Sequence, residues 1–332
     1  MNTLPEQTTP SAPQLGFAMR VGVAVAGLAL DFWADGKEWP LAGLIQHKAK
    51  NDRVSAAIKR PVTKKDETVD EALEPQPIEI SEWNPDRVQV IERLWGEGRA
   101  LPGDETYLDS LTSQLGLNHE SSVLDLSAGF GDMARFIAER YKTYVTGLEQ
   151  DQFLAARGMI MSIAAGKSKQ ASVTPYDPNI YEAARKYDCV IAREIFYKII
   201  GKEKFFQVVN SSIKSGGGHL VFTDYVVEAA ARSKPAVVKW LEFERNAVPM
   251  SLIEIVKTWK QAGYEVRVME DQTQLYKTII LKRLADFVAF ADRHKIGLAS
   301  QMAIAQEIKP WTKRLAAFQQ GLKYYRFHAI KR

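Results

Sequence analysis

Cysteine is almost absent from the sequence: Cys189 is the single one among 332 residues, and there are only five histidines. One cysteine cannot form an intramolecular disulfide, which favours a reducing compartment and predicts a cytoplasmic protein. A structural zinc site takes cysteine and histidine ligands at close spacing. Because the chain has no cysteine pair and its histidines are scattered, the sequence predicts no metal site.

A strong charge excess is also missing. The 44 basic and 40 acidic residues give a net charge of +4, and the basic residues are dispersed among acids. That balance is too weak to predict a nucleic-acid partner. With 46% apolar and 25% charged residues, the chain has the composition of a globular protein with a full core. The sequence therefore predicts no nucleic-acid partner, and it leaves open whether the chain forms a homo-oligomer.

The sequence contains no long apolar run free of charge. The segment from Leu15 to Trp33 is almost wholly apolar, but Arg20 and Asp31 interrupt it and no basic region precedes it. These features argue against a signal peptide and against a membrane span. A helix packed on protein is the favoured interpretation. Peripheral contact of residues 15–33 with a membrane is the alternative that stays open.

Changes in composition divide the chain into six parts. The first residues are polar and proline-containing, which predicts disorder, and a charged stretch with several prolines after residue 58 predicts a linker. The division is a disordered tail (1–14), a helical N-terminal extension (15–58), a linker (59–78), lead-in helices that cap the core (79–120), a core (121–283) and a C-terminal helical segment (284–332).

Strand and helix patterns alternate from Ser122 onward. Strands are expected at 122–126, 143–149, 172–176, 188–192, 219–226, 264–269 and 275–281. Helices are expected at 132–141, 152–165, 179–186, 202–213, 229–245, 251–262, 284–295 and 300–320. Such alternation predicts an α/β fold with a mostly parallel seven-stranded sheet and helices on both faces.

A glycine-rich loop follows the first of these strands. Its two glycines, Gly129 and Gly131, lie between the strand and a helix, where backbone N–H groups can approach a ligand closely. Glu149, eighteen residues after Gly131, ends the second strand and is placed to accept both hydroxyls of a ribose. The pattern Gly129-x-Gly131-x-x-Ala134 also fits a dinucleotide-binding fingerprint. Asp125 favours a cationic ligand over an anionic pyrophosphate, because a carboxylate suits the sulfonium and ammonium of S-adenosylmethionine.

Several segments in order resemble the class I S-adenosylmethionine-dependent methyltransferases. VLDLSAGFG is similar to the first motif of that family, YVTGLE to its second strand, YDCVIAREIFYKI to its fourth strand and IKSGGGHLVFTDYV to its fifth. The resemblance covers about Ser121 to Leu281 and implies a Rossmann-like fold with S-adenosylmethionine as cofactor. The cofactor-binding residues that it implies are Asp125, Ser127, Gly129, Gly131, Glu149, Gln150, Tyr176 and Asp177. The chain departs from the family at Ser127, where the family loop has its first glycine.

The segment before the core, Ile91 to Tyr107, resembles the lead-in of phosphobase N-methyltransferases and related small-molecule enzymes. The resemblance implies that a glycine-containing loop and an aromatic side chain close over the methionine end of the cofactor. Trp95 is the expected aromatic residue, and a core position in a helix is the alternative. A covered site would exclude water, which favours methyl transfer from a sulfonium.

Methyl transfer is a direct displacement, so proximity and in-line geometry do most of the work, and a base is needed only for a protonated nucleophile. The catalytic candidates at the end of the fourth strand are Arg193, Glu194 and Tyr197. The alternative for Arg193 and Glu194 is that they pair with each other. The aromatic and basic stretches 240–245 and 323–332 suit a cationic amine and an anionic group.

The predicted function is methylation of a small molecule, with an amine as the favoured acceptor. Three alternatives remain open at this point. They are a lipid or quinone methyltransferase at a membrane surface, a non-catalytic cofactor-binding domain with a role in assembly, and an NAD-dependent oxidoreductase.

Overall fold

The computed structural model describes residues 83–294 and 298–332. In this part of the chain seven strands form one sheet in the order β3-β2-β1-β4-β5-β7-β6, in which β7 alone is antiparallel to its neighbours. The strands are β1 (Ser122–Asp125), β2 (Tyr144–Glu149), β3 (Ala171–Pro175), β4 (Cys189–Arg193), β5 (His219–Val227), β6 (Tyr264–Asp271) and β7 (Leu322–Lys331). The predicted α/β fold with a mostly parallel seven-stranded sheet is confirmed.

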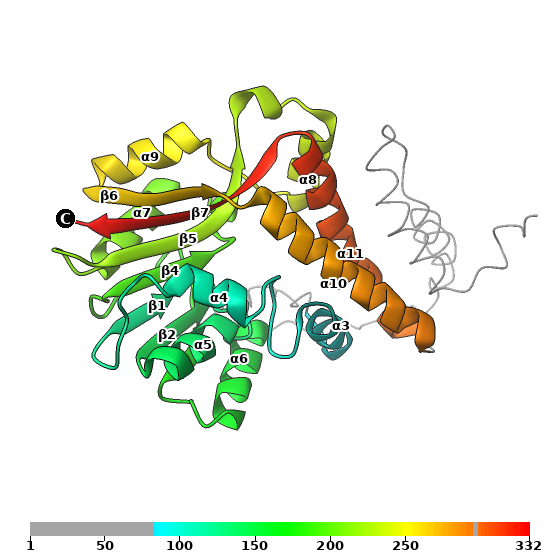
Figure 1. Cartoon of the computed structure of the whole chain (residues 1–332), viewed down its shortest axis with the longest axis horizontal. Coiled ribbons are helices and arrows are strands. Elements are labelled where there is room, and N and C mark those ends of the chain that lie inside the picture. The colour runs from blue at the N-terminus through cyan, green and yellow to red at the C-terminus, as the bar shows by residue number, and fades with distance from the viewer. Residues whose placement is uncertain (1–82, 295–297) are drawn as a thin grey trace, which may run out of the picture. The chain divides into compact units, whose positions relative to one another are not determined.

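Helices cover both faces of the sheet (Figure 1). They are α3 (Pro85–Trp95), α4 (Glu105–Thr112), α5 (Asp132–Tyr141), α6 (Gln152–Ala164), α7 (Lys202–Ser212), α8 (Pro235–Glu244), α9 (Leu252–Gln261), α10 (Thr273–Arg293) and α11 (Leu298–Gln319), with short 3-10 turns η2 (Phe196–Lys198) and η3 (Ala229–Ala231). One apolar cluster lies where α7 and α9 meet the strands, with Phe206, Phe222, Trp259 and Phe327 among its buried residues.

The end of the chain differs from the prediction. The strand expected at 275–281 is wrong, because that stretch belongs to the 21-residue helix α10. Buried Tyr276, Ile280, Leu284 and Phe287 recur at three- and four-residue intervals, which is a helical period. The short apolar run at 275–281, taken alone, resembles a strand. The helical period becomes visible only over the full length of α10.

The seventh strand is instead the C-terminal stretch β7, which lies between β5 and β6. Its alternation and its aromatic and β-branched residues suit a strand with both neighbours paired. The expected boundary between a core ending at 283 and an all-helical segment 284–332 is therefore wrong. The helices α10 and α11, which run side by side in Figure 1, are an insertion between β6 and β7.

The helix expected at 179–186 is also wrong, since the structure has only turns there. The carboxylate of Asp177 accepts hydrogen bonds from the backbone and side-chain nitrogens of Asn179, which forms a local turn that competes with a helix. Ile180 is 76% exposed, so no apolar face is available to hold a helix on the sheet.

The predictions for residues 1–82, including the apolar segment 15–33 and the linker 59–78, lie outside the described residues. Within 83–294 and 298–332, no helix has the length and apolar character needed to cross a membrane.

Candidate active site

The strand order places one crevice at the carboxyl edge of the sheet. From β1 the chain adds β2 and β3 on one side and then returns to add β4 on the other. Ligands of such open sheets bind where the order reverses, outside the carboxyl ends of the two central strands. Asp125 is the last residue of β1 and Arg193 the last residue of β4, so both lie at that crevice.

The loop after β1 needs its glycines. Gly129 and Gly131 have φ angles of +53° and +76°, in the left-handed region that favours glycine. A Cβ on Gly131 would lie 2.9 Å from a methyl carbon of Val173, and one on Gly129 would lie 3.1 Å from Cβ of Ala100. The loop is thus enclosed by β3 on one side and by the lead-in segment on the other.

Ser127, which replaces the first glycine of the family loop, ties the loop to both strands. Its hydroxyl accepts a hydrogen bond from the backbone N–H of Arg193 at 2.6 Å, and its own N–H donates to Oδ1 of Asp125 at 3.0 Å. The serine therefore joins the end of β4 to the end of β1, a contact that a glycine could not make.

Asp125 carries a buried carboxylate at the end of β1, beside the glycine loop. The residue is 1% exposed, and among the described residues its Oδ2 atom has no hydrogen-bond partner. Burial raises the pKa of Asp125 to about 7, while the hydrogen bond from Ser127 acts in the opposite direction. The carboxylate is thus poised to gain from a cationic partner.

Glu149 lies at the end of β2 and faces the same loop. Its Oε2 accepts a hydrogen bond from the N–H of Gly129 at 2.8 Å, and its Oε1 accepts one from the N–H of Asp151 at 3.1 Å. Burial raises the pKa of Glu149. Because a carboxylate oxygen has two lone pairs, each oxygen keeps one for a further donor. Gln150, the next residue, is exposed.

The two residues predicted to lie near an adenine have different surroundings. The hydroxyl of Tyr176 donates to the carbonyl of Leu126 at 2.8 Å, so its side chain crosses from the end of β3 to the glycine loop. Asp177 is exposed and engaged in the turn described above. Tyr176 thus belongs to the same cluster as the loop, whereas the role of Asp177 stays a prediction.

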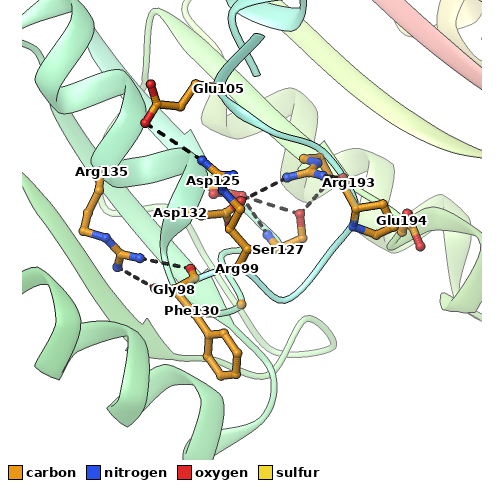
Figure 2. Close-up of polar contacts among 12 residues, drawn as sticks. Gly98, Arg99, Glu105, Asp125, Ser127, Phe130, Asp132, Arg135, Arg193 and Glu194 are labelled. Carbon is orange, nitrogen blue, oxygen red and sulfur yellow. Dashed lines mark hydrogen bonds and ion pairs between the residues drawn. The ribbon is translucent and has the colours of Figure 1, made fainter. Parts of the chain in front are cut away.

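Two arginines join the lead-in segment to the loop, one on each side of it (Figure 2). Arg135 of α5 donates to the carbonyls of Gly98 (3.1 Å) and Phe130. Arg193 donates to the carbonyl of Pro102 at 2.8 Å and lies 3.5 Å from a carboxylate oxygen of Asp132. The segment 96–104 therefore lies beside the glycine loop, as the lead-in prediction requires.

Trp95 itself is 2% exposed, and its ring packs edge-to-face on Trp311 of α11 with ring centroids 4.7 Å apart. In the described structure the tryptophan thus serves the packing of α3 on α11. Its contact with a cofactor stays a prediction.

Glu194 forms the centre of a second cluster, on the side of Arg193 away from the loop (Figure 2). Its φ angle of +54° is unusual for a residue with a side chain, and such strain concentrates at functional sites. The carboxylate accepts hydrogen bonds from the hydroxyls of Tyr225 (2.9 Å), Tyr276 and Tyr324 (3.5 Å). The rings of Tyr276 and Tyr324 stack with centroids 3.8 Å apart. Glu194 has tyrosine partners and Arg193 has Asp132, so the alternative of a pair between them is wrong.

Tyr197, the third catalytic candidate, contributes its hydroxyl to a different network. That hydroxyl accepts from Arg314 at 3.1 Å and donates to Glu244 at 3.3 Å, and Arg314 and Glu244 form an ion pair at 2.7 Å. The Tyr197 ring lies edge-on to Tyr225, with centroids 4.9 Å apart. The two networks are therefore contiguous through aromatic rings.

Sequence reasoning did not identify Tyr225, Tyr276, Arg314 and Asp224 as site residues. The predicted stretches 240–245 and 323–332 do contain Glu244 and Tyr324, so composition located two of the segments involved. The other signal in the sequence was the helical or alternating spacing of buried aromatic residues. Ordinary core residues show the same spacing, so it does not single out a site.

The known proteins that this chain resembles include methyltransferases. A family model described as a methyltransferase domain matches residues 101–268. Phosphoethanolamine N-methyltransferase 1 of Zea mays is 23% identical over 213 residues, which are 64% of this chain and 41% of the relative. Phosphoethanolamine N-methyltransferase 3 of Arabidopsis thaliana is 22% identical over 242 residues, 73% of this chain and 48% of the relative. The chain spans less than half the length of these two relatives.

Solved structures share the fold. Phosphoethanolamine N-methyltransferase 2 of Haemonchus contortus, in complex with S-adenosyl-L-methionine, superposes with a TM-score of 0.63 at 19% identity and covers 74% of this chain and 56% of its own. A methyltransferase from Geobacter sulfurreducens in complex with S-adenosyl-L-homocysteine has a TM-score of 0.57 at 16% identity and covers 74% of this chain and 98% of its own.

Proposed function

Because the chain belongs to the methyltransferase-domain family, we propose that it transfers the methyl group of S-adenosylmethionine to the amine nitrogen of a small molecule. The observation that carries the choice of an amine is Glu194, a carboxylate held by three tyrosine hydroxyls one residue from the strand end that contacts the glycine loop. A carboxylate among aromatic rings is a surrounding that attracts an ammonium group.

The loop after β1 fits the cofactor. Asp125 offers a buried carboxylate oxygen to a cationic group, and Glu149 offers an acceptor on each oxygen to two ribose hydroxyls. The left-handed glycines let the loop backbone pack closely against Val173 and Ala100, where a side chain would collide. When bound, the cofactor supplies an electrophilic methyl group on a sulfonium. The dinucleotide alternative has no use for Asp125, whose charge would oppose a pyrophosphate.

Glu194 orients the acceptor and receives its proton. An amine in water at neutral pH is mostly an ammonium ion, which has no lone pair for attack. Glu194 accepts a hydrogen bond from that ammonium and takes up a proton from it, while the tyrosine rings exclude water from the nitrogen. The same hydroxyls that now donate to Glu194 hold the carboxylate in a fixed orientation.

Arg193 connects the proposed cofactor site at the glycine loop with the proposed acceptor site at Glu194. Its backbone N–H holds Ser127 of the glycine loop, its guanidinium holds the lead-in segment at Pro102, and the residue after it is Glu194. Glu194 is 9% exposed and the surrounding tyrosines are buried. A substrate therefore reaches the carboxylate only when a covering element moves, and the site then closes around it.

The experiment is a methyl-transfer assay with labelled S-adenosylmethionine and a panel of amines. The panel contains phosphoethanolamine and its monomethyl form, which the names of the relatives suggest as substrates. It also contains ethanolamine, sarcosine and dimethylglycine. Product is identified by mass spectrometry. Glu194→Gln keeps the shape of the side chain and removes its charge, so we expect it to lower kcat/KM for the amine by about a hundred-fold or more.

The matched control is Glu242→Gln on the exposed side of α8, which should leave turnover unchanged. Full activity of the Glu194→Gln variant would show that the carboxylate does not act on the acceptor. Cofactor binding without transfer to any amine would contradict the proposed function.

A further inference from the structure

The turn η2, which carries Tyr197, is held by the buried carboxylate of Asp224 and by the half-buried ammonium of Lys202. Oδ2 of Asp224 on β5 accepts a hydrogen bond from the backbone N–H of Tyr197 at 3.2 Å. The ammonium of Lys202, at the start of α7, donates to the carbonyls of Phe196 and Ile199, the latter at 2.9 Å. A negative charge on turn N–H groups and a positive charge on turn carbonyls both match the dipole of the turn.

Asp224 also fixes the second tyrosine. Its Oδ1 accepts from the N–H of Tyr225 at 2.6 Å, so one carboxylate holds the backbone of both aromatic residues. The hydroxyl of Tyr225 donates to Glu194, and that of Tyr197 lies in the Arg314–Glu244 network. The position of Asp224 therefore sets the relative placement of the two networks.

The carboxylate has little solvent to screen it. Asp224 is 1% exposed and lines, with Lys202, a small cavity of about 10 Å³ whose other walls are mostly apolar. The other lining residues are Phe196, Tyr197, Phe206, Phe222, Tyr225, Met250 and Ile255. A cavity of this size holds about one water molecule, so it is not a substrate pocket. In these surroundings the charge of Asp224 acts at close to full strength on its two N–H partners.

From these contacts we infer that Asp224, with Lys202 as its counterpart, is a positioning residue that aligns Tyr197 and Tyr225 for the amine substrate. The inference rests on the proposed function, because Tyr225 is one of the tyrosines that hold Glu194 at the proposed acceptor site, and the Tyr197 ring packs against it. Asp224 acts through the backbone of the tyrosines and does not itself contact substrate.

The charge of Asp224 gives this alignment a pH dependence. The pKa of Asp224 is raised to about 7, mainly by burial and also by Glu194, while the hydrogen bonds from Tyr225 and Tyr197 and the charge of Lys202 act in the opposite direction. Burial lowers the pKa of Lys202 to about 8, while Asp224 and Glu254 act to raise it. Both groups are charged only in a window around neutral pH. Alignment is then strongest between about pH 7 and 8 and is lost as Asp224 becomes protonated below it.

The test is Asp224→Asn, which keeps the shape but replaces one of the two acceptor oxygens by an NH₂ group. At saturating cofactor we expect KM for the amine to rise about ten-fold or more, on the scale of a lost hydrogen bond to a charged group. The acidic limb of kcat/KM near pH 7 should disappear, and the Kd for the cofactor should stay within two-fold. Lys202→Met should also raise KM for the amine. Lys204→Met, at an exposed position of the same helix, is the matched control.

A second measurement does not depend on turnover. Tyr197 stacks on Trp240 with ring centroids 5.9 Å apart, so near-ultraviolet circular dichroism reports its placement. The wild-type protein should show a transition near pH 7 that Asp224→Asn lacks. If no amine is methylated but the transition is present, the proposed function fails and the positioning role stands. Absence of the transition, or an Asp224→Asn variant with unchanged amine KM, overturns the inference.

Discussion

At the residue scale, the charge of Asp125 should make the affinity for the cofactor depend on pH. Its pKa is raised to about 7 by burial, so the carboxylate gains its charge as the pH rises through neutrality. A cationic ligand binds the charged form better, and affinity for S-adenosylmethionine should therefore increase between about pH 6 and 8, by roughly ten-fold. Titration calorimetry measures this change. Asp125→Asn should bind weakly with no such slope, and an equally steep slope in that variant would show that another group is responsible.

Glu149 has a separate proposed role in cofactor binding. Glu149→Ala removes the proposed ribose acceptors and should weaken binding by about 1.5–3 kcal/mol, the scale of a lost hydrogen bond to a charged group. Glu139→Gln, on the exposed side of α5, serves as the control. Unchanged affinity in the Glu149 variant would remove the ribose role from this residue.

Residue patterns predicted the glycine loop after β1 better than the proposed acceptor site around Glu194, and the reason is physical. Asp125, Gly129 and Gly131 follow one another in a single turn, so their spacing is visible in the sequence. The tyrosine partners of Glu194 lie 31, 82 and 130 residues away. No local spacing encodes such a cluster, because the order of strands in the sheet brings it together.

At the scale of elements, the packing of α3 on α11 decides between two roles for Trp95. Truncation of a fully buried tryptophan costs about 3–5 kcal/mol, so Trp95→Ala should lower the free energy of unfolding by that amount in urea. If Trp95 only packs on Trp311, the folded variant keeps its cofactor affinity, and the double variant with Trp311→Ala shows coupling between the two sites. Weaker cofactor binding at unchanged stability would instead support a role in lining the site.

The elements also show where periodicity is decisive. The strand expected at 275–281 and the helix expected at 179–186 both rested on short windows. Over its full length α10 buries Tyr276, Ile280, Leu284 and Phe287 along one face, whereas 179–186 has no apolar face to bury. Long periodic segments such as α5 and α7 were predicted correctly because their pattern extends over several turns.

At the scale of the whole molecule, two histidines couple the stability of the sheet to pH. His219 on β5 and His328 on β7 lie with ring nitrogens 2.9 Å apart. Burial lowers the pKa of His328 to about 4, helped by His219, Arg326 and Arg267, and burial also lowers the pKa of His219. An unfolded histidine titrates near pH 6.5, so between about pH 6.5 and 4 these two histidines bind more protons in the unfolded chain than in the folded one. Asp125 and Asp224, whose pKa values are raised by folding, contribute with the opposite sign.

The histidine contribution to stability should therefore fall as the pH is lowered through that window. The Tm of His328→Gln relative to that of the wild-type protein should rise as the pH is lowered from about 7 to 5. His119→Gln, at an exposed histidine in the loop before β1, should retain the wild-type slope. Parallel slopes for all three proteins would show that acid sensitivity originates elsewhere.

The position of β7 has a consequence for biosynthesis. The ribosome releases β5 and β6 before β7 exists, and those two strands cannot pair with each other in the finished order. Roughly a hundred residues separate the end of β5 from the end of β7, so at about 5–20 residues per second the nascent chain exposes two unpaired strand edges for several seconds or more. A chain interrupted before Leu322 also lacks Tyr324, one of the hydroxyls that hold Glu194. Chains that lack β7 should thus be both inactive and prone to aggregate.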